Sequence, residues 1–458
     1  IRWSRPMEKT SSWVLPAVAL LLAAWPQAPA ASPPLEVEIA ETRVAKVEPA
    51  ANQADPSPRA EPAAESEPGL DQFARLCRQT LPDVAEMVGL PVGDTVRIEM
   101  MSRAELADFM LRMVDIEYPE DELVKRSRCF WEIGLVPEGY DLEQGFVDLL
   151  AEQAGAAYDP HTKSLRGLTD LPSFLMNAQT QKLIASHELC HALQDRVIDI
   201  AAQARACLAD LDREYALRAT IEGMATVVML AYSQGLSTDQ VPEARAVMRA
   251  GFAQNRNNPG MKSLASSPEY LRESLFSPYA DGAAFAQAWL RANPDSRLGA
   301  MLERMPMTSE QVLHFERYLE GDGPTPVDLS AIEAELPDGW SPFHANTLGE
   351  FDLRLLFENF EETRAVAADA AAGWDGLWYK AYTDPGGDLL LAACSVWDTE
   401  SDAREFGDQL AKVLARHRPN RSGLVCEGRT VGFVVGPTEE RLRNDILAAL
   451  TRANPHAN

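Results

Sequence analysis

Hydrophobic residues recur along the chain with two different periods, and the changes between them mark the expected elements. From Leu70 the stretch LDQFARLCRQTLPDVAEMVG has the three-to-four-residue spacing of a helix, whereas DTVRIEMM alternates as a strand does. The stretch EQAGAAYDPHTKSLRGL predicts two short strands joined by a loop over 159–163. A helix follows, for which Asn177 is a suitable N-cap.

A second helix is predicted by LDREYALRATIEGMATVVML, residues 211–230. From about Thr347 the pattern changes. Strand-like GLWYKAYT and DLLLAACSVW precede helical ESDAREFGDQLAKVLARH, and strand-like GLVCEGRTVGFVVG precedes helical EERLRNDILAALTRA. This ββαββα order predicts a small accessory domain at 341–458, and α+β is the fold class expected for the whole chain.

The helix after Asn177 carries the motif IASHELCHALQDR. Its residues His187 and His191 are four apart, so they share one face of the helix, with Glu188 projecting beside them. Two imidazoles at this spacing suit Zn²⁺, and the neighbouring carboxylate can serve as general base toward the water that zinc activates. Asp195, one turn later, is expected to orient a histidine by a hydrogen bond. A chance match to so short a motif is the competing explanation.

A site with two histidines needs a third protein ligand. The pattern HExxHxxGxxH is excluded, because Val197 stands where its third histidine would be and Gln194 replaces its glycine. Glu222, in an apolar run of the second helix, is the expected ligand, since a carboxylate in such surroundings needs a partner. The small residues Gly223 and Ala225 are expected to let this helix approach the first one closely.

Other assignments stay open for this part of the site. Glu222 could simply pair with Arg218 at i,i+4, as such residues often do on helices. Asp212 and Glu214 are further candidates for the third ligand, although Glu214 lies in a polar stretch.

These residues resemble the gluzincin class of zinc metallopeptidases, in which HExxH is completed by a glutamate on a following helix. More narrowly, the chain is similar to uncharacterised exported bacterial proteins carrying HELxHALQD, an upstream YDPxTK and a downstream SEQVLHxExY. Here these motifs are 187–195, 158–163 and 309–318, and the resemblance covers roughly 70–450.

The resemblance implies peptide-bond hydrolysis and a zincin-like core of two lobes. The first lobe, 70–200, would hold a mixed sheet and the active-site helix. A helical lobe, 201–340, would supply the third zinc ligand, and 341–458 would follow as the accessory domain.

A hydrolytic zinc site usually needs a hydrogen-bond donor directed at the oxyanion of the tetrahedral intermediate. His314 is the preferred candidate and Tyr279 the second. His314 could instead be a structural histidine, and Tyr279 could cap the start of a helix beside Pro278.

The chain has six cysteines, an even number that permits three disulfides in an exported protein. For Cys190 the alternative is a buried small hydrophobe, and a thiolate ligand is not needed beside two histidines and a glutamate. The expected pairs are Cys77–Cys129, Cys190–Cys207 and Cys394–Cys426.

The start of the chain predicts export. Residues 1–30 combine Lys9, the apolar run VLPAVALLLAAW and a small A-x-A site, which together describe a signal peptide. The run is too short for a comfortable membrane span, although an uncleaved anchor is the alternative. Residues 31–69, rich in Ala, Pro and Glu, predict a disordered linker. We therefore expect a periplasmic or extracellular protein without a stable membrane span after cleavage.

The amino-acid composition argues against one class of binding partner. A net charge of −27 over 458 residues argues against a nucleic-acid ligand, which demands a basic surface. The leading hypothesis is an exported zinc metallopeptidase that acts as an endopeptidase on a protein or peptide substrate. The alternatives are a protein that keeps zinc only as structure and an inactive binding or chaperone-like module of the cell envelope. The intact Glu188 argues against a structural zinc site, which needs no general base.

Overall fold

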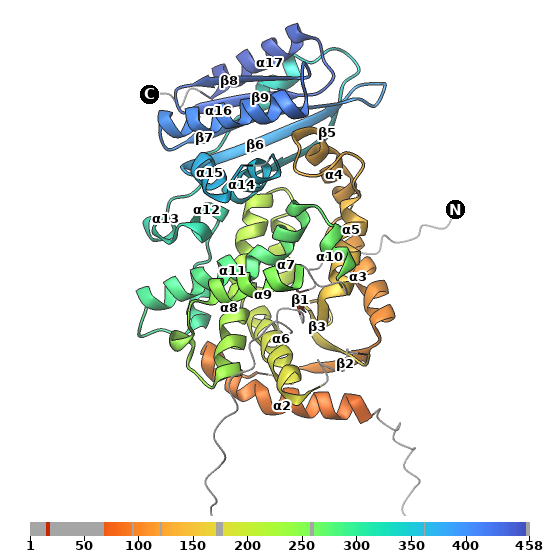
Figure 1. The fold of residues 1–458 in the computed structure, drawn as a ribbon, viewed down its shortest axis with the longest axis vertical. Coiled ribbons are helices and arrows are strands. Elements are labelled where there is room, and N and C mark those ends of the chain that lie inside the picture. The colour runs from red at the N-terminus through yellow and green to blue at the C-terminus, as the bar shows by residue number, and fades with distance from the viewer. Residues whose placement is uncertain are drawn as a thin grey trace, which may run out of the picture.

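The structure is a computed structural model, and it confirms the α+β class, with helices throughout and separate sheets of four and five strands. Figure 1 shows the five-stranded sheet at one end of the long axis and α2 (Pro68–Val88) at the other. Nearly all of the predicted signal peptide and linker lies outside the described residues. The structure describes residues 15–18, 68–93, 96–119, 121–170, 177–256, 261–360 and 362–454.

The smaller sheet has the strand order β1-β3-β4-β2. Its strands are β1 (Leu15–Val18), β2 (Arg97–Met101), β3 (Ala154–Asp159) and β4 (Ser164–Leu168). β3 and β4 form the predicted antiparallel hairpin, β2 runs parallel to β4, and β1, from the predicted signal peptide, pairs antiparallel with β3. The side chain of Asp159 closes the hairpin loop by accepting the backbone N–H of His161 at 2.9 Å.

The helix that carries the histidine motif is α6 (Ala178–Ile198). The predicted N-cap is confirmed, because the side chain of Asn177 accepts the backbone N–H of Thr180 at 2.9 Å. α2 packs along one side of α6 and α8 along another. The helices that join β2 to β3, and those that follow α6 up to α8, are α3 (Arg103–Glu117), α4 (Glu122–Ile133), α5 (Leu142–Gln153), α7 (Ile200–Ala206) and α8 (Leu211–Gln234).

α11 (Glu269–Ala292) packs extensively against α8, and the two helices come very close at Gly223 and Gly282. A Cβ atom at either glycine would clash with the backbone of the other helix. Gly223 therefore faces α11, not α6 as its sequence context suggested. The remaining short elements of this lobe are η2 (Thr238–Gln240), α9 (Ala244–Arg256), α10 (Lys262–Ser266), η3 (Leu298–Glu303), α12 (Ser309–Leu313), α13 (Phe315–Glu320) and η4 (Ser330–Ala334).

The C-terminal part contains the predicted ββαββα order, preceded by one further strand and two helices. The five-stranded sheet is antiparallel, with the order β5-β6-β7-β9-β8. Its elements are β5 (Ser341–Thr347), α14 (Glu350–Asn359), α15 (Arg364–Ala371), β6 (Trp374–Thr383), β7 (Leu389–Trp397), α16 (Glu400–His417), β8 (Ser422–Glu427), β9 (Thr430–Val435) and α17 (Glu440–Ala453).

Alternate residues of this sheet enter two different cores, so both faces are covered. On β7, Leu391 and Ala393 share a cluster with the apolar residues of α16, whereas Ala392 and Cys394 share one with those of α17. This two-sided burial explains why β7 is apolar along most of its length.

The structure does not contain the three predicted disulfides, because all six cysteines are free thiols. Cys394 and Cys426 lie on β7 and β8, which are separated by β9, and their side chains point to opposite faces of the sheet. Strands two places apart are about 9–10 Å from each other, beyond the reach of a disulfide.

The cysteines of the other two predicted pairs, Cys190–Cys207 and Cys77–Cys129, pack in different surroundings. Cys190 lies in the main core, whereas Cys207 belongs to a separate small cluster around α7. Cys129 contacts His344 at 3.8 Å, while Cys77 on α2 lies near Glu188. Burial raises the pKa of Cys190 and Cys129, so both behave as buried hydrophobic groups.

Candidate metal centre

α6 places the two histidines of the motif one turn apart, as their spacing predicts. The rings of His187 and His191 are 4.6 Å apart and nearly perpendicular, and the two side chains are 2% and 0% exposed. Their Nε2 atoms both face α8, where Glu222 is also buried.

Glu222 completes the group as the predicted third ligand. Its Oε2 atom lies 3.1 Å from His187 Nε2 and 3.5 Å from His191 Nε2. Two bonds of about 2.0–2.1 Å at a tetrahedral angle place their donor atoms roughly 3.3 Å apart, so this set of atoms fits a zinc-sized ion. Among the described residues, these three form the group whose ligand atoms lie within 4.8 Å of one another.

The other candidates for the third ligand are engaged elsewhere. Asp212, at the start of α8, accepts the backbone N–H of Ser309 at 2.8 Å. Glu214 accepts the hydroxyl of Tyr118 at 2.8 Å and pairs with Arg126 at 3.0 Å. Both contribute to packing around the first turns of α8 and lie outside the group of ligand atoms.

The charge on Glu222 is stabilised within this group. Burial alone would raise the pKa of its carboxyl, but the imidazoles of His191 and His187 and their hydrogen bonds lower it to about 2. An ionised carboxylate and two imidazoles are the ligand types that zinc prefers.

Gln194 takes the orienting role that the sequence suggested for Asp195. His191 Nδ1 lies 2.8 Å from Gln194 Oε1, and the amide nitrogen of Gln194 donates to the carbonyl of Ile221 on α8. With the Nδ1 proton donated to the amide oxygen, Nε2 is the nitrogen of His191 that can bind a metal ion. Gln194 is at i+3 from His191 and Asp195 at i+4, so both positions were compatible with the same face of the helix.

Asp195 instead joins α6 to the β3–β4 hairpin. Its Oδ2 accepts the hydroxyl of Tyr158 at 2.8 Å and the ammonium group of Lys163 at 2.7 Å. Its Oδ1 accepts the backbone N–H of Ile200 at 2.9 Å. Two motifs singled out in the sequence, YDPxTK and HELxHALQD, therefore meet at this carboxylate, which holds the hairpin against the helix.

Glu188 is buried beside the three candidate ligands without belonging to them. It is 0% exposed, and its carboxylate is not part of the group of ligand atoms. Its charge influences the pKa of Cys77 on α2, His191 on α6 and Tyr279 on α11. Glu188 is thus enclosed between these helices, and three protein ligands leave a fourth position open on a tetrahedral ion.

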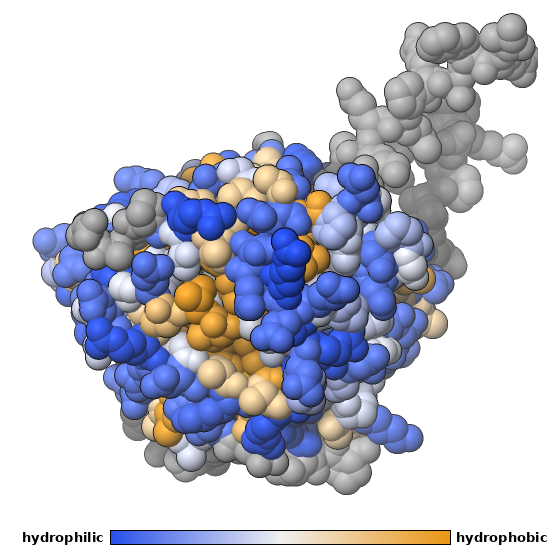
Figure 2. Space-filling model, turned by 90° about the horizontal axis from the view of Figure 1, so that it is seen from above, coloured by the Kyte–Doolittle hydropathy of each residue, from blue (hydrophilic) through white to orange (hydrophobic). Residues whose placement is uncertain are grey.

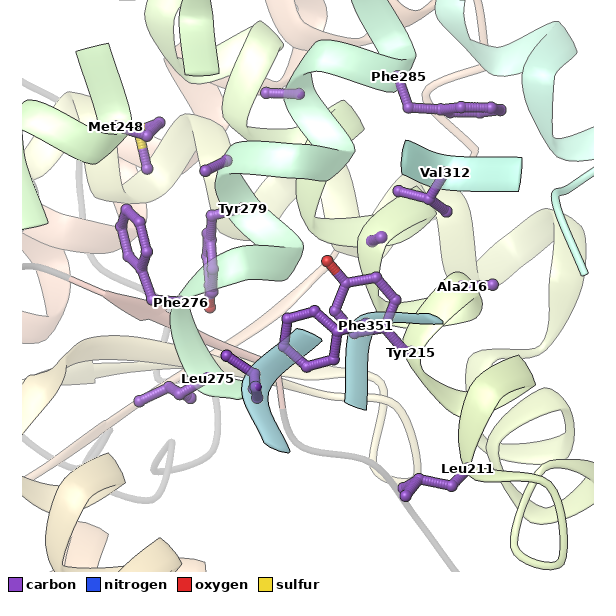
Figure 3. Packing of buried hydrophobic residues seen from close by; sticks show 14 of the residues in the cluster. Leu211, Tyr215, Ala216, Met248, Leu275, Phe276, Tyr279, Phe285, Val312 and Phe351 are labelled. Carbon is purple, nitrogen blue, oxygen red and sulfur yellow. The ribbon is translucent and has the colours of Figure 1, made fainter. Parts of the chain in front are cut away.

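Tyr279 lies at the centre as well. Its ring stacks on that of His187, with centroids 5.8 Å apart and planes at 18°. Burial raises the pKa of its hydroxyl well above the ordinary value, as do the negative charge of Glu222 and a hydrogen bond to it. Figure 3 shows Tyr279 among the buried residues of α11, near Phe276. Because α11 begins at Glu269, Tyr279 does not cap a helix start.

His314 belongs to a different part of the fold. It lies between α12 and α13, and its Nε2 is 2.9 Å from Glu350 Oε1 on α14 and 3.2 Å from the guanidinium of Arg354. The structure therefore does not bring His314 to His187, His191 and Glu222. Its neighbourhood in the sequence gave no sign of this, because Glu350 and Arg354 lie in the next region of the chain.

Comparison with known proteins covers a limited part of the molecule. Residues 341–445 match a family described as a domain of unknown function, DUF8575. That stretch begins at β5 and ends within α17, so it excludes α6, α8 and α11. Comparison with curated proteins and with solved structures gives no match.

Proposed function

We propose that the chain is a zinc-dependent hydrolase that cleaves peptide bonds, built on a zincin-like core. The observation that carries the proposal is the convergence of His187 Nε2, His191 Nε2 and Glu222 Oε2, with the carboxylate of Glu188 supplied from the same turn as the two histidines. The choice of the peptide bond rests on the resemblance to gluzincins.

His187, His191 and Glu222 would hold the ion. Zinc, when bound, lowers the pKa of a water molecule and polarises the carbonyl group that is to be attacked. Gln194 keeps His191 in the tautomer whose Nε2 is available, and it is itself fixed to α8 through the carbonyl of Ile221. The ligand set is thus braced by contacts between α6 and α8.

Glu188 is the general base in this proposal. It accepts a proton from the attacking water and delivers it to the leaving amine nitrogen as the peptide bond breaks. Its burial suits this role, because a carboxylate in a low-dielectric site interacts strongly with charge that develops nearby.

Tyr279 replaces His314 as the proposed donor to the oxyanion. It stacks on His187, and its hydroxyl stays protonated because its pKa is raised. A neutral hydroxyl can donate a hydrogen bond to the carbonyl oxygen as negative charge builds on that atom.

One observation favours the alternative of a zinc protein without catalysis. The centre is enclosed by α2, α6, α8 and α11, because four of its residues are fully buried: His187, Glu188, His191 and Glu222. Enclosure of this kind is common in structural metal sites. The proposal therefore needs a test that separates bound metal from turnover.

The test compares the parent with Glu188→Gln and with Glu316→Gln, a control glutamate that is 71% exposed. We expect about one zinc per chain in all three by elemental analysis, since a three-ligand site remains. Cleavage of unfolded casein should fall by roughly 10²- to 10⁴-fold in Glu188→Gln alone. A zinc-loaded parent that does not cleave casein would establish the non-catalytic alternative, and unchanged cleavage by Glu188→Gln would assign the activity elsewhere.

Export and an extracytoplasmic protein or peptide substrate are further parts of the proposal, and they rest on the predicted signal peptide. Over the described ranges, the helices include none long and apolar enough to span a bilayer.

A further inference from the structure

The two edges of the C-terminal sheet differ in how they are protected. The β5 edge carries Pro342, a register shift between Pro342 and His344, and α4 packed beside it. The β8 edge pairs with β9 without a register shift and contains no proline. Prolines, bulges and covering elements are the devices that prevent edge strands from pairing with other chains. The β8 edge lacks the proline and the register shift that protect the β5 edge.

The outer side of β8 is open and partly apolar. All six of its residues are half-buried or exposed, and Leu424 and Val425 occupy its middle. In an antiparallel pair, alternate residues direct their backbone N–H and C=O groups away from the partner, so half of these groups on β8 face outward from β9. Figure 2 looks onto the C-terminal end of the molecule, where some apolar residues lie at the surface among hydrophilic ones.

We propose that two copies of the chain pair antiparallel through β8, so that their sheets form one continuous sheet across a two-fold axis. The proposal goes beyond the metal centre and does not depend on it. A two-fold axis perpendicular to the sheet keeps each face on its own side, so residues opposite each other must point to the same face. Ser422, Leu424 and Cys426 face α16, and the residues between them face α17.

Charge selects the register. With Leu424 opposite the partner's Leu424, Ser422 lies opposite the partner's Cys426, and Arg421 lies opposite the partner's Glu427. Arg421 and Glu427 are both exposed, and the symmetry makes this opposite-charge pair twice. A register centred on Val425 would place Glu427 opposite Gly423 and leave no such pair. The arrangement centred on Leu424 is therefore the one we adopt.

α16 adds a second complementarity. It lies over β8 and would run antiparallel to the partner's α16 across the axis. Its first half carries four acidic residues and one basic residue, Arg404, which pairs with Glu400, and its second half carries Lys412 and Arg416. Antiparallel helices place each acidic half near the other's basic half. This self-complementarity favours a second copy of the chain over an unrelated extended peptide.

Disulfide trapping tests the register directly. Residues directly opposite in an antiparallel pair have Cα atoms about 4.5–5.5 Å apart, within the range of a disulfide. Ser422→Cys should therefore form a covalent dimer of the 50.3 kDa chain with Cys426 under mild oxidation. Residues 422 and 426 of one chain are four strand positions apart, about 13 Å, so they cannot bond to each other.

Matched variants make the trapping specific. Ser422→Cys combined with Cys426→Ser should stay monomeric on a non-reducing gel, because the second thiol is absent. Val425→Cys should also stay monomeric, since Gly423 of the partner lies opposite it. Cross-linking of Val425→Cys would overturn the proposed register, because it would place the axis at Val425.

Mass in solution supplies a test that needs no new cysteine. We expect the parent chain to sediment as a dimer, and both Arg421→Glu and Glu427→Arg to weaken the dimer at least tenfold in dissociation constant. The double charge reversal should restore dimerisation, which a merely structural role would not do. A parent that sediments as a monomer at tens of micromolar, or as a monomer that binds extended peptides at β8, would overturn the proposal.

Discussion

Two clusters in this molecule join a histidine to a buried glutamate, but their remaining neighbours differ, and so does the chemistry that each cluster can support. In the first, His187 and His191 converge on one oxygen of Glu222 at 3.1 and 3.5 Å. In the second, His314 shares Glu350 with the guanidinium of Arg354. A permanent cation thus already balances Glu350, whereas two imidazoles and a carboxylate make a ligand set for an added ion.

A histidine near a glutamate is a poor indicator of chemistry until its other neighbours are known. The histidines of both clusters lie within motifs singled out in the sequence, yet only the first cluster has ligand atoms that converge. The second joins the segment around α12 to α14 and so connects the helical lobe to the C-terminal domain.

Removing the carboxylate from each cluster in turn should give the largest contrast. Glu222→Gln removes a proposed zinc ligand, so we expect zinc per chain to fall from about one to below a tenth after dialysis. Glu350→Gln should keep its zinc, because its partners are His314 and Arg354. Elemental analysis of both folded variants measures this. Full zinc in Glu222→Gln would reject Glu222 as a ligand.

The cleavage rates of two variants should show whether Tyr279 or His314 donates to the oxyanion. Tyr279→Phe removes a hydroxyl at the centre, and loss of one oxyanion donor costs roughly 10²- to 10³-fold in kcat. His314→Gln should change kcat by less than about twofold if it acts only in packing. Steady-state cleavage of casein by the zinc-loaded variants gives both values. A larger loss in His314→Gln than in Tyr279→Phe would reverse the assignment.

Gln194 and Asp195 differ by one residue but should affect different quantities. Loss of a side chain that orients a metal ligand typically weakens metal binding by about 10- to 100-fold, which we expect for Gln194→Leu. Asp195→Asn should weaken the contact with Tyr158 and Lys163 and lower the unfolding temperature instead. Competition with a zinc chelator and thermal unfolding of both variants distinguish the two. Equal effects on zinc affinity would contradict the assignment of Gln194.

The smallest effect concerns a carboxyl group near the second cluster. Burial raises the pKa of Glu310 to about 9, with Glu350, Asp398 and Asp322 raising it and Arg317 lowering it. The folded-state pKa therefore lies above the ordinary value of 4.5, so folding favours the protonated form. Stability is then fully present below about pH 4.5 and is lost as the pH rises through 9.

Glu310→Gln keeps the neutral form at every pH. We expect it to unfold a few degrees higher than the parent at pH 8, at roughly 2–4 °C per kcal/mol, and to show little difference at pH 5. Thermal unfolding across this range provides the measurement. A lower unfolding temperature for Glu310→Gln at pH 8 would show that the ionised group stabilises the fold through Arg317.

Local patterns predicted the elements of the site well. Helical spacing placed His187 and His191 on one face, an apolar run pointed to Glu222, and turn residues located the hairpin at 159–163. The C-terminal strands and helices were equally readable, because alternation and helical periodicity are properties of short stretches.

The predictions failed where the contacts of a side chain depend on residues that are distant in the sequence. Gln194 and Asp195 are equally placed behind His191, and only the hairpin residues Tyr158 and Lys163 show which one is already engaged. His314 was expected beside the motif on α6, whereas its partners Glu350 and Arg354 lie on α14. The pairing of cysteines depends on strand order, and the position of β9 between β7 and β8 cannot be read from spacing alone.

The contact between Gly223 and Gly282 has an evolutionary consequence. One position adjoins Glu222, the proposed metal ligand on α8, and the other lies three residues after Tyr279, the proposed donor on α11, so any side chain at either glycine would move both residues at once. Neither glycine can be exchanged singly and repaired by a neighbour, because the obstacle is backbone. The two positions should therefore be conserved together. We expect glycine at both positions in every homologue that keeps this centre, and substitutions at both in homologues that have lost it.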